Sequence, residues 1–238
     1  MKRSLLLAAA LLACIGAIAL CTHLGDEKPS ASGPALPVQP LYFTPRGASI
    51  GGVVAPNGKT EIQCDLPEKL HTKNCGGSDG SGLCVFTSIM HSARYQHVPV
   101  LEDFQDWMKK KPGGGWPDKV KKMITQISKE RGVAEPPYLQ VEGKDIEILK
   151  TACAGGRMPS VTYSHSPTGR YGGGRIAHMV SLPHADDTYF AVLDNNYIGA
   201  KNYEWMSPQE FMSTYAQGGS GWSVILLDPG PPNPPRNR

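Results

Sequence analysis

The segment Cys84-Val-Phe-Thr-Ser-Ile-Met-His-Ser-Ala-Arg-Tyr-Gln96 decides the fold of this chain, because it combines a helical pattern with a reactive side chain. Glycines at 76, 77, 80 and 82 precede it, so we expect the helix to begin near Gly82. Cys84 then lies in the first turn, where free N–H groups and the positive end of the helix dipole stabilise a thiolate. Four apolar residues recur at helical spacing and predict its buried face: Phe86, Ile89, Met90 and Ala93.

The pattern around this segment predicts helices first and strands second. Further helices are expected at 101–110, 117–131 and 145–154, each with an apolar stripe. Strand signals follow at 160–164, 175–182, 188–193 and 222–227, with Asp186-Asp187 as a hairpin turn. Ser207-Pro-Gln-Glu210 is a capping box that opens a short helix ending near Tyr215. A helical half followed by an antiparallel half indicates the α+β class.

Length and charge limit the possible functions. The chain has 238 residues and 40% hydrophobic residues, enough for one large domain or two small ones with a packed core. The formal net charge is +3, of which Lys2 and Arg3 contribute two. So small an excess predicts neither a nucleic-acid partner nor binding to an anionic membrane surface.

Both ends of the chain have the composition of segments outside the folded domain. Two basic residues precede the uncharged run 4–20, and Ala17-Ile-Ala19 fits a cleavage site, so 1–21 is predicted to be a signal peptide. An uncleaved N-terminal anchor and lipidation of Cys21 are the alternatives. We therefore expect a secreted or periplasmic protein, or a membrane-anchored one facing outside. Residues 22–40 are predicted to be a linker, 41–228 the folded domain, and 229–238 a proline-rich tail.

Two later positions complete a pattern of thiol catalysis. His178 lies in an apolar strand pattern, and Asp194-Asn195 follows the next one. A cysteine, then a distant histidine, then an Asp or Asn is a known order for a nucleophile, its base and the group that orients the base. Asp194 and Asn195 point to opposite faces of a strand, so alternation does not choose between them; we prefer Asp194. The alternatives are a buried core thiol at Cys84, a structural His178 and turn residues at 194–195.

These residues resemble the papain-fold cysteine peptidases, and are closest to the C39-like group. The resemblance covers about 70–228 and rests on Gly82-Leu-Cys-Val-Phe86, Ile176-Ala-His-Met-Val180 and Ala191-Val-Leu-Asp-Asn195. It implies a papain-like α+β fold, in which a helical half with the nucleophilic Cys84 packs on an antiparallel sheet with the base His178. It also implies a peptide or protein substrate and a mechanism that needs no metal or organic cofactor.

The chain departs from this family before the cysteine. The family usually has a Gln about six residues earlier, which helps to bind the oxyanion, and Ser78 stands there. Asn74 and Ser78, with Ser81, are the candidate donors beside the Cys84 N–H. We therefore expect an exported papain-like thiol hydrolase that cleaves a peptide or amide bond. The alternatives are a catalytically degenerate binding protein of the same fold, and an acyl-transferring or cell-wall amidase relative.

The other cysteines bear on whether Cys84 stays free. Without the leader the chain keeps Cys64, Cys75, Cys84 and Cys153, and an oxidising compartment tends to pair thiols. If Cys84 is the nucleophile, Cys64–Cys75 is the expected disulfide because it closes a short loop, and Cys153 is left as a core thiol. A metal site at 64, 75 and 84 is disfavoured, because this spacing lacks the close ligand pairs of structural zinc sites.

Overall fold

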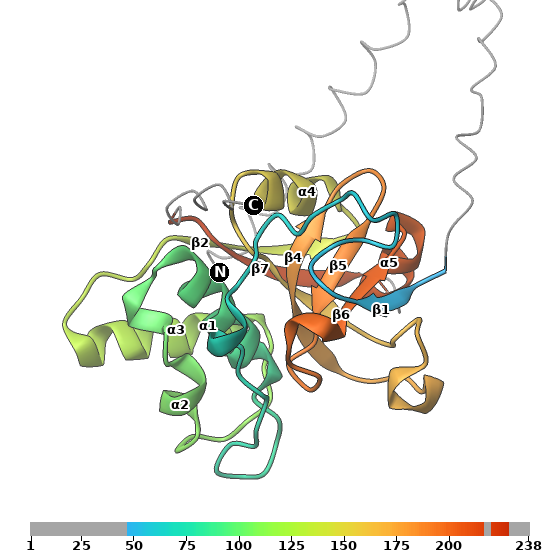
Figure 1. Cartoon of the computed structure of the whole chain (residues 1–238). Helices are drawn as coiled ribbons and strands as arrows, with labels where there is room; N and C mark the ends of the chain where they lie inside the picture. Colours follow the sequence, from blue (N-terminus) through green and yellow to red (C-terminus); the bar gives the residue numbers. More distant parts are fainter. Residues whose placement is uncertain (1–46, 217–219, 229–238) are drawn as a thin grey trace, which may run out of the picture. The chain divides into compact units, whose positions relative to one another are not determined.

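The computed structural model describes residues 47–216 and 220–228, and these form an α+β fold (Figure 1). The expected signal peptide (1–21), linker (22–40) and tail (229–238) lie outside the described residues. No helix within the described ranges is long and apolar enough to cross a membrane.

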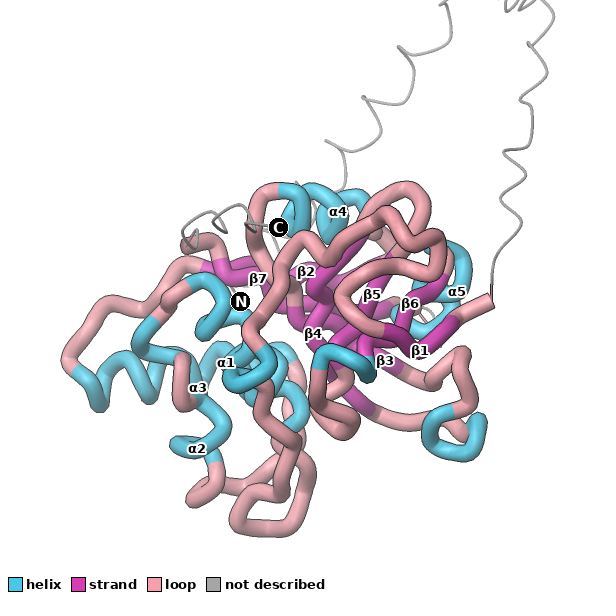
Figure 2. The backbone as a smooth tube through the Cα atoms, viewed as in Figure 1, coloured by secondary structure: helices cyan, strands magenta, loops and turns pink. Residues whose placement is uncertain are grey.

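The described chain contains five α-helices and seven strands, which Figure 2 colours cyan and magenta. The helices are α1 Cys84–Gln96, α2 Phe104–Met108, α3 Pro117–Arg131, α4 Glu147–Ala154 and α5 Pro208–Tyr215. Short 3-10 turns are η1 Glu68–Leu70, η2 Pro99–Leu101, η3 Arg170–Gly173 and η4 Ala200–Asn202. The strands are β1 Ser49–Gly51, β2 Tyr138–Gly143, β3 Ser160–Tyr163, β4 His178–Ala185, β5 Phe190–Leu193, β6 Tyr203–Met206 and β7 Gly221–Leu226.

The strands form one antiparallel sheet in the order β1-β6-β5-β4-β3-β7-β2. The predicted hairpin is confirmed: β4 pairs with β5, and the N–H of Asp186 donates to the carbonyl of Tyr189 at 2.9 Å. The capping box is also confirmed, because Ser207 and Glu210 exchange both hydrogen bonds at the start of α5.

Some elements differ from the sequence-based prediction. The predicted helix 101–110 is shorter, since a 3-10 turn precedes α2 and only Phe104–Met108 is α-helical. Strands β1, β2 and β6 were not predicted. Two of these have only three or four residues, and β2 alternates between half-buried and exposed positions. So weak an apolar pattern does not separate a strand from a loop.

Strand β4 separates two layers of core. Met179 packs with the helices α1 to α3, whereas its neighbours Val180 and Leu182 pack with residues of α4 and α5. Because successive strand residues point to opposite faces, α1 covers one face of the sheet and α4 and α5 cover the other. This arrangement places the start of α1 beside the start of β4.

Candidate active site

Cys84 is the first residue of α1, and the loop before it is held in place by backbone contacts. The N–H of Leu83 donates to the Asn74 side-chain oxygen at 3.0 Å and to the carbonyl of Cys75 at 2.9 Å. The glycine segment 113–115 packs directly on this loop and on the first turn of α1. A Cβ at Gly113 would lie 1.9 Å from the carbonyl oxygen of Ser81, and one at Gly115 would lie 2.5 Å from the Val85 side chain. Only glycine fits at these two positions.

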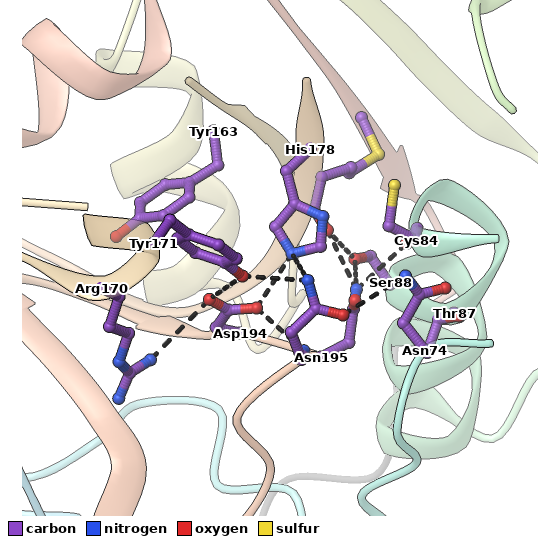
Figure 3. A network of polar contacts seen from close by, with 12 residues as sticks. Asn74, Cys84, Thr87, Ser88, Tyr163, Arg170, Tyr171, His178, Asp194 and Asn195 are labelled. Carbon is purple, nitrogen blue, oxygen red and sulfur yellow. Dashed lines mark hydrogen bonds and ion pairs between the residues drawn. The ribbon is translucent and has the colours of Figure 1, made fainter. Parts of the chain in front are cut away.

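His178 begins β4 and lies between Cys84 and Asp194 (Figure 3). Its Nε2 atom lies 2.9 Å from Oδ1 of Asp194, which follows directly after β5. The other ring nitrogen, Nδ1, faces Cys84. The structure thus brings together three residues of the predicted constellation, in the order thiol, imidazole, carboxylate.

The electrostatics of the three groups favour a charged pair. Burial opposes ionisation of Cys84, but the hydrogen bond and charge of His178 outweigh it and hold the thiol pKa below its ordinary value. Burial also opposes an imidazolium, but Asp194 and Cys84 stabilise it and raise the pKa of His178 to about 9. Burial disfavours the carboxylate too, yet its bond to His178 leaves the pKa of Asp194 lowered. The lowered pKa of Cys84 and the raised pKa of His178 both favour a Cys84 thiolate beside a His178 imidazolium.

Asn195 has a different position from Asp194. Its side-chain nitrogen donates to the carbonyls of Cys84 and Met179, at 3.1 and 2.9 Å, and to the hydroxyl of Ser88 at 2.9 Å. It therefore ties the first turn of α1 to β4 without reaching the ring of His178. Asp194 is the residue in contact with His178, as preferred above, and Asn195 positions the two elements that carry the thiol and the imidazole.

Three further residues hold Asp194, and the sequence pattern did not identify them. The Tyr171 hydroxyl donates to Oδ2 of Asp194 at 2.7 Å, and the backbone N–H of Asn196 donates to Oδ1 at 2.9 Å. The guanidinium of Arg170 lies 3.8 Å from Oδ2. Residues 170 and 171 directly precede the glycines 172–174. An Arg-Tyr pair before a glycine run has no catalytic signature of its own.

Tyr171 has an unusual backbone conformation. Its φ is +62°, in the left-handed region that non-glycine residues seldom occupy. Its ring packs edge-on against that of His178, with centroids 6.0 Å apart, and Asn196 donates to its hydroxyl at 3.0 Å. The conformation aims the hydroxyl at Asp194 and places the ring edge-on to the imidazole. Backbone strain of this kind is concentrated at functional sites.

The two candidate oxyanion donors differ in position. Asn74 lies beside Cys84 in Figure 3, and its amide nitrogen donates to the side chain of Asn196 at 3.3 Å. Its second amide hydrogen is left for another acceptor. Ser78 is exposed in the loop, where its backbone N–H bonds the carbonyl of Lys111 at 2.9 Å. Of the two, Asn74 is the residue placed at the site.

The structure does not contain the predicted Cys64–Cys75 disulfide; all four described cysteines are free thiols. Cys64 is buried in the cluster around Trp205, whereas Cys75 packs against the core of α1 to α3. Closeness in sequence does not bring them together, because the intervening chain passes from one core cluster to the other. Among the described residues no group of three His, Cys, Asp or Glu side chains is arranged to hold a metal ion.

A cleft of about 490 Å3 opens at the thiol and the imidazole. Gly114, Gly115 and the half-exposed Trp116 line part of it, and the rest of the lining is mainly apolar and aromatic. It includes Thr162, Tyr163, Ser164, Ile176, Ala177, Met179, Tyr215, Ser220 and Trp222. The cleft is large enough for several residues of an extended peptide beside Cys84.

No protein-family model matches this chain, and comparison with curated proteins finds no significant relative.

Proposed function

We propose that the chain is a thiol hydrolase that cleaves a peptide or amide bond with Cys84 as nucleophile, His178 as acid and base, and Asp194 as the orienting group. The observation that carries the proposal is the convergence of these residues from the start of α1, the start of β4 and the end of β5. A structural role alone does not explain a thiol at a helix N-terminus, an imidazole with a raised pKa and a buried carboxylate on its far nitrogen. The resemblance to C39-like, papain-fold peptidases supports the same reaction class.

The proposed first step is attack of the Cys84 thiolate on the carbonyl carbon of the scissile amide. The backbone N–H of Cys84 and the free amide hydrogen of Asn74 stabilise the oxyanion. Nδ1 of His178 donates its proton to the leaving nitrogen, the C–N bond breaks, and the amine departs. A thioester between Cys84 and the acyl group remains.

The second step releases the acid. Nδ1 of the now neutral His178 takes a proton from water, the hydroxide attacks the thioester carbonyl, and the C–S bond breaks. Throughout, the bond from Nε2 to Asp194 fixes the ring so that Nδ1 faces Cys84. No step requires a metal or an organic cofactor. Consistent with the predicted leader, we propose that the protein acts outside the cytoplasm.

Substrate profiling with matched variants tests the proposal. Wild type, Cys84→Ala and His178→Ala are each incubated with a peptide library, with glutamine donors plus an amine acceptor, and with muropeptides. Hydrolysis of peptides by the wild type alone supports a peptidase. Transfer to the amine, or cleavage of muropeptides, instead supports the acyl-transferase or amidase reading. Turnover of all three substrate classes that is equal in wild type and Cys84→Ala contradicts a thiol mechanism.

A further inference from the structure

Two thiols remain outside the proposed mechanism, and they lie together in the interior. Cys64 and Cys153 are 0% and 1% exposed. The Sγ of Cys64 lies 3.6 Å from the carbonyl oxygen of Cys153 and 3.4 Å from that of Arg157, so the two cysteines are neighbours in the core. Cysteines that contact each other in this way are candidates for a disulfide.

Two successive residues of strand β4, Leu182 and Pro183, contact the two cysteines through their backbone carbonyls. The Cys153 thiol lies 3.3 Å from the carbonyl oxygen of Leu182, and the backbone N–H of Cys64 donates to the carbonyl of Pro183 at 2.8 Å. Their juxtaposition therefore depends on packing against the central strand of the sheet. Cys75 lies elsewhere, close enough to Lys109, which directly follows α2, to interact with its charge.

We propose that Cys64 and Cys153 form an intramolecular disulfide when the chain folds in the presence of a disulfide oxidant. One thiolate attacks a sulfur of the oxidant, forming a mixed disulfide and releasing one thiol. The second cysteine then attacks the protein sulfur of that mixed disulfide and displaces the other oxidant thiol. The protein loses two hydrogen atoms, and the oxidant is reduced from one disulfide to two thiols.

The surroundings of the pair place the reaction during folding. Burial raises the pKa of the Cys153 thiol well above its ordinary value, so a thiolate is scarce once the core has closed. The bond would link positions 89 residues apart, a span that contains Cys84. It would also remove Cys64 and Cys153 as competing partners of the proposed nucleophile. The inference does not depend on the proposed activity, because the bond can form in an inactive chain.

Peptide mapping tests the proposal, because trypsin separates the relevant cysteines. Cleavage after lysine and arginine yields 60–69 with Cys64, 151–157 with Cys153, and 74–94 with Cys75 and Cys84. The full chain is unfolded and reduced, refolded in a mixture of reduced and oxidised glutathione, alkylated with iodoacetamide and digested without reductant. We expect peptide 60–69 linked to 151–157, two hydrogen masses below the sum of the free peptides.

Any other state of these peptides contradicts the proposal. A link from 60–69 to 74–94, glutathione on Cys64 or Cys153, or alkylation of both overturns it. Cys75→Ser is the matched control and should keep the 60–69 to 151–157 link. As a second readout, the thermal midpoint of the refolded wild type should fall by roughly 10 °C on reduction, because the bond closes a long loop. Cys153→Ala should show no such fall; an equal fall in this variant also contradicts the assignment.

Discussion

His178 and Asp194 are sixteen residues apart in the chain, yet Nε2 of the first lies 2.9 Å from Oδ1 of the second. The contact exists because β4 and β5 form a hairpin, which brings the residue at the start of one strand beside the residue at the end of the other. A buried carboxylate on one nitrogen leaves the other nitrogen directed at Cys84.

Asp194→Asn removes the charge while keeping the shape of the side chain. We expect kcat to fall about 100-fold to 10,000-fold, as for the equivalent change in a serine peptidase triad. The pKa of His178 should fall from about 9, because Asp194 is the main group that raises it. Kinetics and NMR titration of the imidazole measure both. Asn195→Ala is the comparison: it should lower the free energy of unfolding by about 1–3 kcal/mol, because it removes the buried hydrogen bonds of the side-chain nitrogen to two carbonyls and a hydroxyl. If Asn195→Ala leaves stability unchanged and Asp194→Asn retains full activity, the two assignments are wrong.

Tyr171→Phe removes only the hydroxyl that bonds Asp194. We expect kcat to fall about tenfold, the size of one lost hydrogen bond to a charged group. The alkaline limb of the pH–rate profile, which reports loss of the imidazolium, should also move. Tyr197→Phe is the control, since only its ring contacts Tyr171 in the structure. Equal pH–rate profiles for wild type and Tyr171→Phe would show that the tyrosine only packs there.

Asn74→Asp tests the oxyanion assignment with little change in packing. The carboxylate still accepts from the N–H of Leu83 but replaces the amide donor with a negative charge. We expect kcat to fall by about 100-fold or more, with KM little changed, because the lost interaction exists only in the transition state. Ser78→Ala is predicted to have wild-type rates. A slow Ser78→Ala with a normal Asn74→Asp would reverse the assignment.

We expect the folded protein to lose stability in acid because of the buried His91. It is buried in α1, where its Nε2 accepts the N–H of Thr72 at 2.9 Å. Burial, with the charges of His71 and Arg94, lowers its pKa to about 3. The unfolded chain, with an ordinary pKa near 6.5, therefore binds this proton more readily between about pH 6.5 and 3. The stabilisation is complete above about pH 6.5 and decreases as the pH falls, by up to ~1.4 kcal/mol per unit.

Urea unfolding at about pH 7.5 and about pH 5 measures this effect. His91→Gln keeps a hydrogen-bond acceptor without the titration, so it should lose less stability on acidification than the wild type. His97→Asn is the control at an exposed position with left-handed backbone, which Asn tolerates. Equal acid loss in wild type and His91→Gln would contradict the account.

The parts of the fold that the sequence predicted are those with strong local signals. Helix α3 has Pro117 at its first position and Gly132 with φ +64° after its last, and its bounds agree with the prediction. The apolar alternation and the turn at 186–187 predicted the β4–β5 hairpin. Strand β6 gave no such signal, because its central residue Glu204 is a buried carboxylate that is bonded by Tyr163, Ser166 and Thr168.

The residues of the candidate site that the sequence predicted are likewise those with a strong local signal. Cys84 and His178 were identifiable because a reactive side chain coincided with the start of a helix or a strand. Tyr171 and Asn196 were not, because their role arises from where two distant loops meet. The disulfide prediction failed for a related reason: loop length favoured Cys75 as the partner of Cys64, whereas packing placed Cys153 beside it.

The pH dependence of Cys84 alkylation tests the central claim most directly. Iodoacetamide reacts with the thiolate, and His178 holds the pKa of Cys84 below its ordinary value. At about pH 6, Cys84 of the wild type should be alkylated faster than Cys75, which lies on the same tryptic peptide and serves as the internal control. In His178→Ala this advantage should disappear, and the rate should rise only toward the pKa of a free thiol. An unchanged labelling rate in His178→Ala would show that Cys84 and His178 are not a catalytic pair.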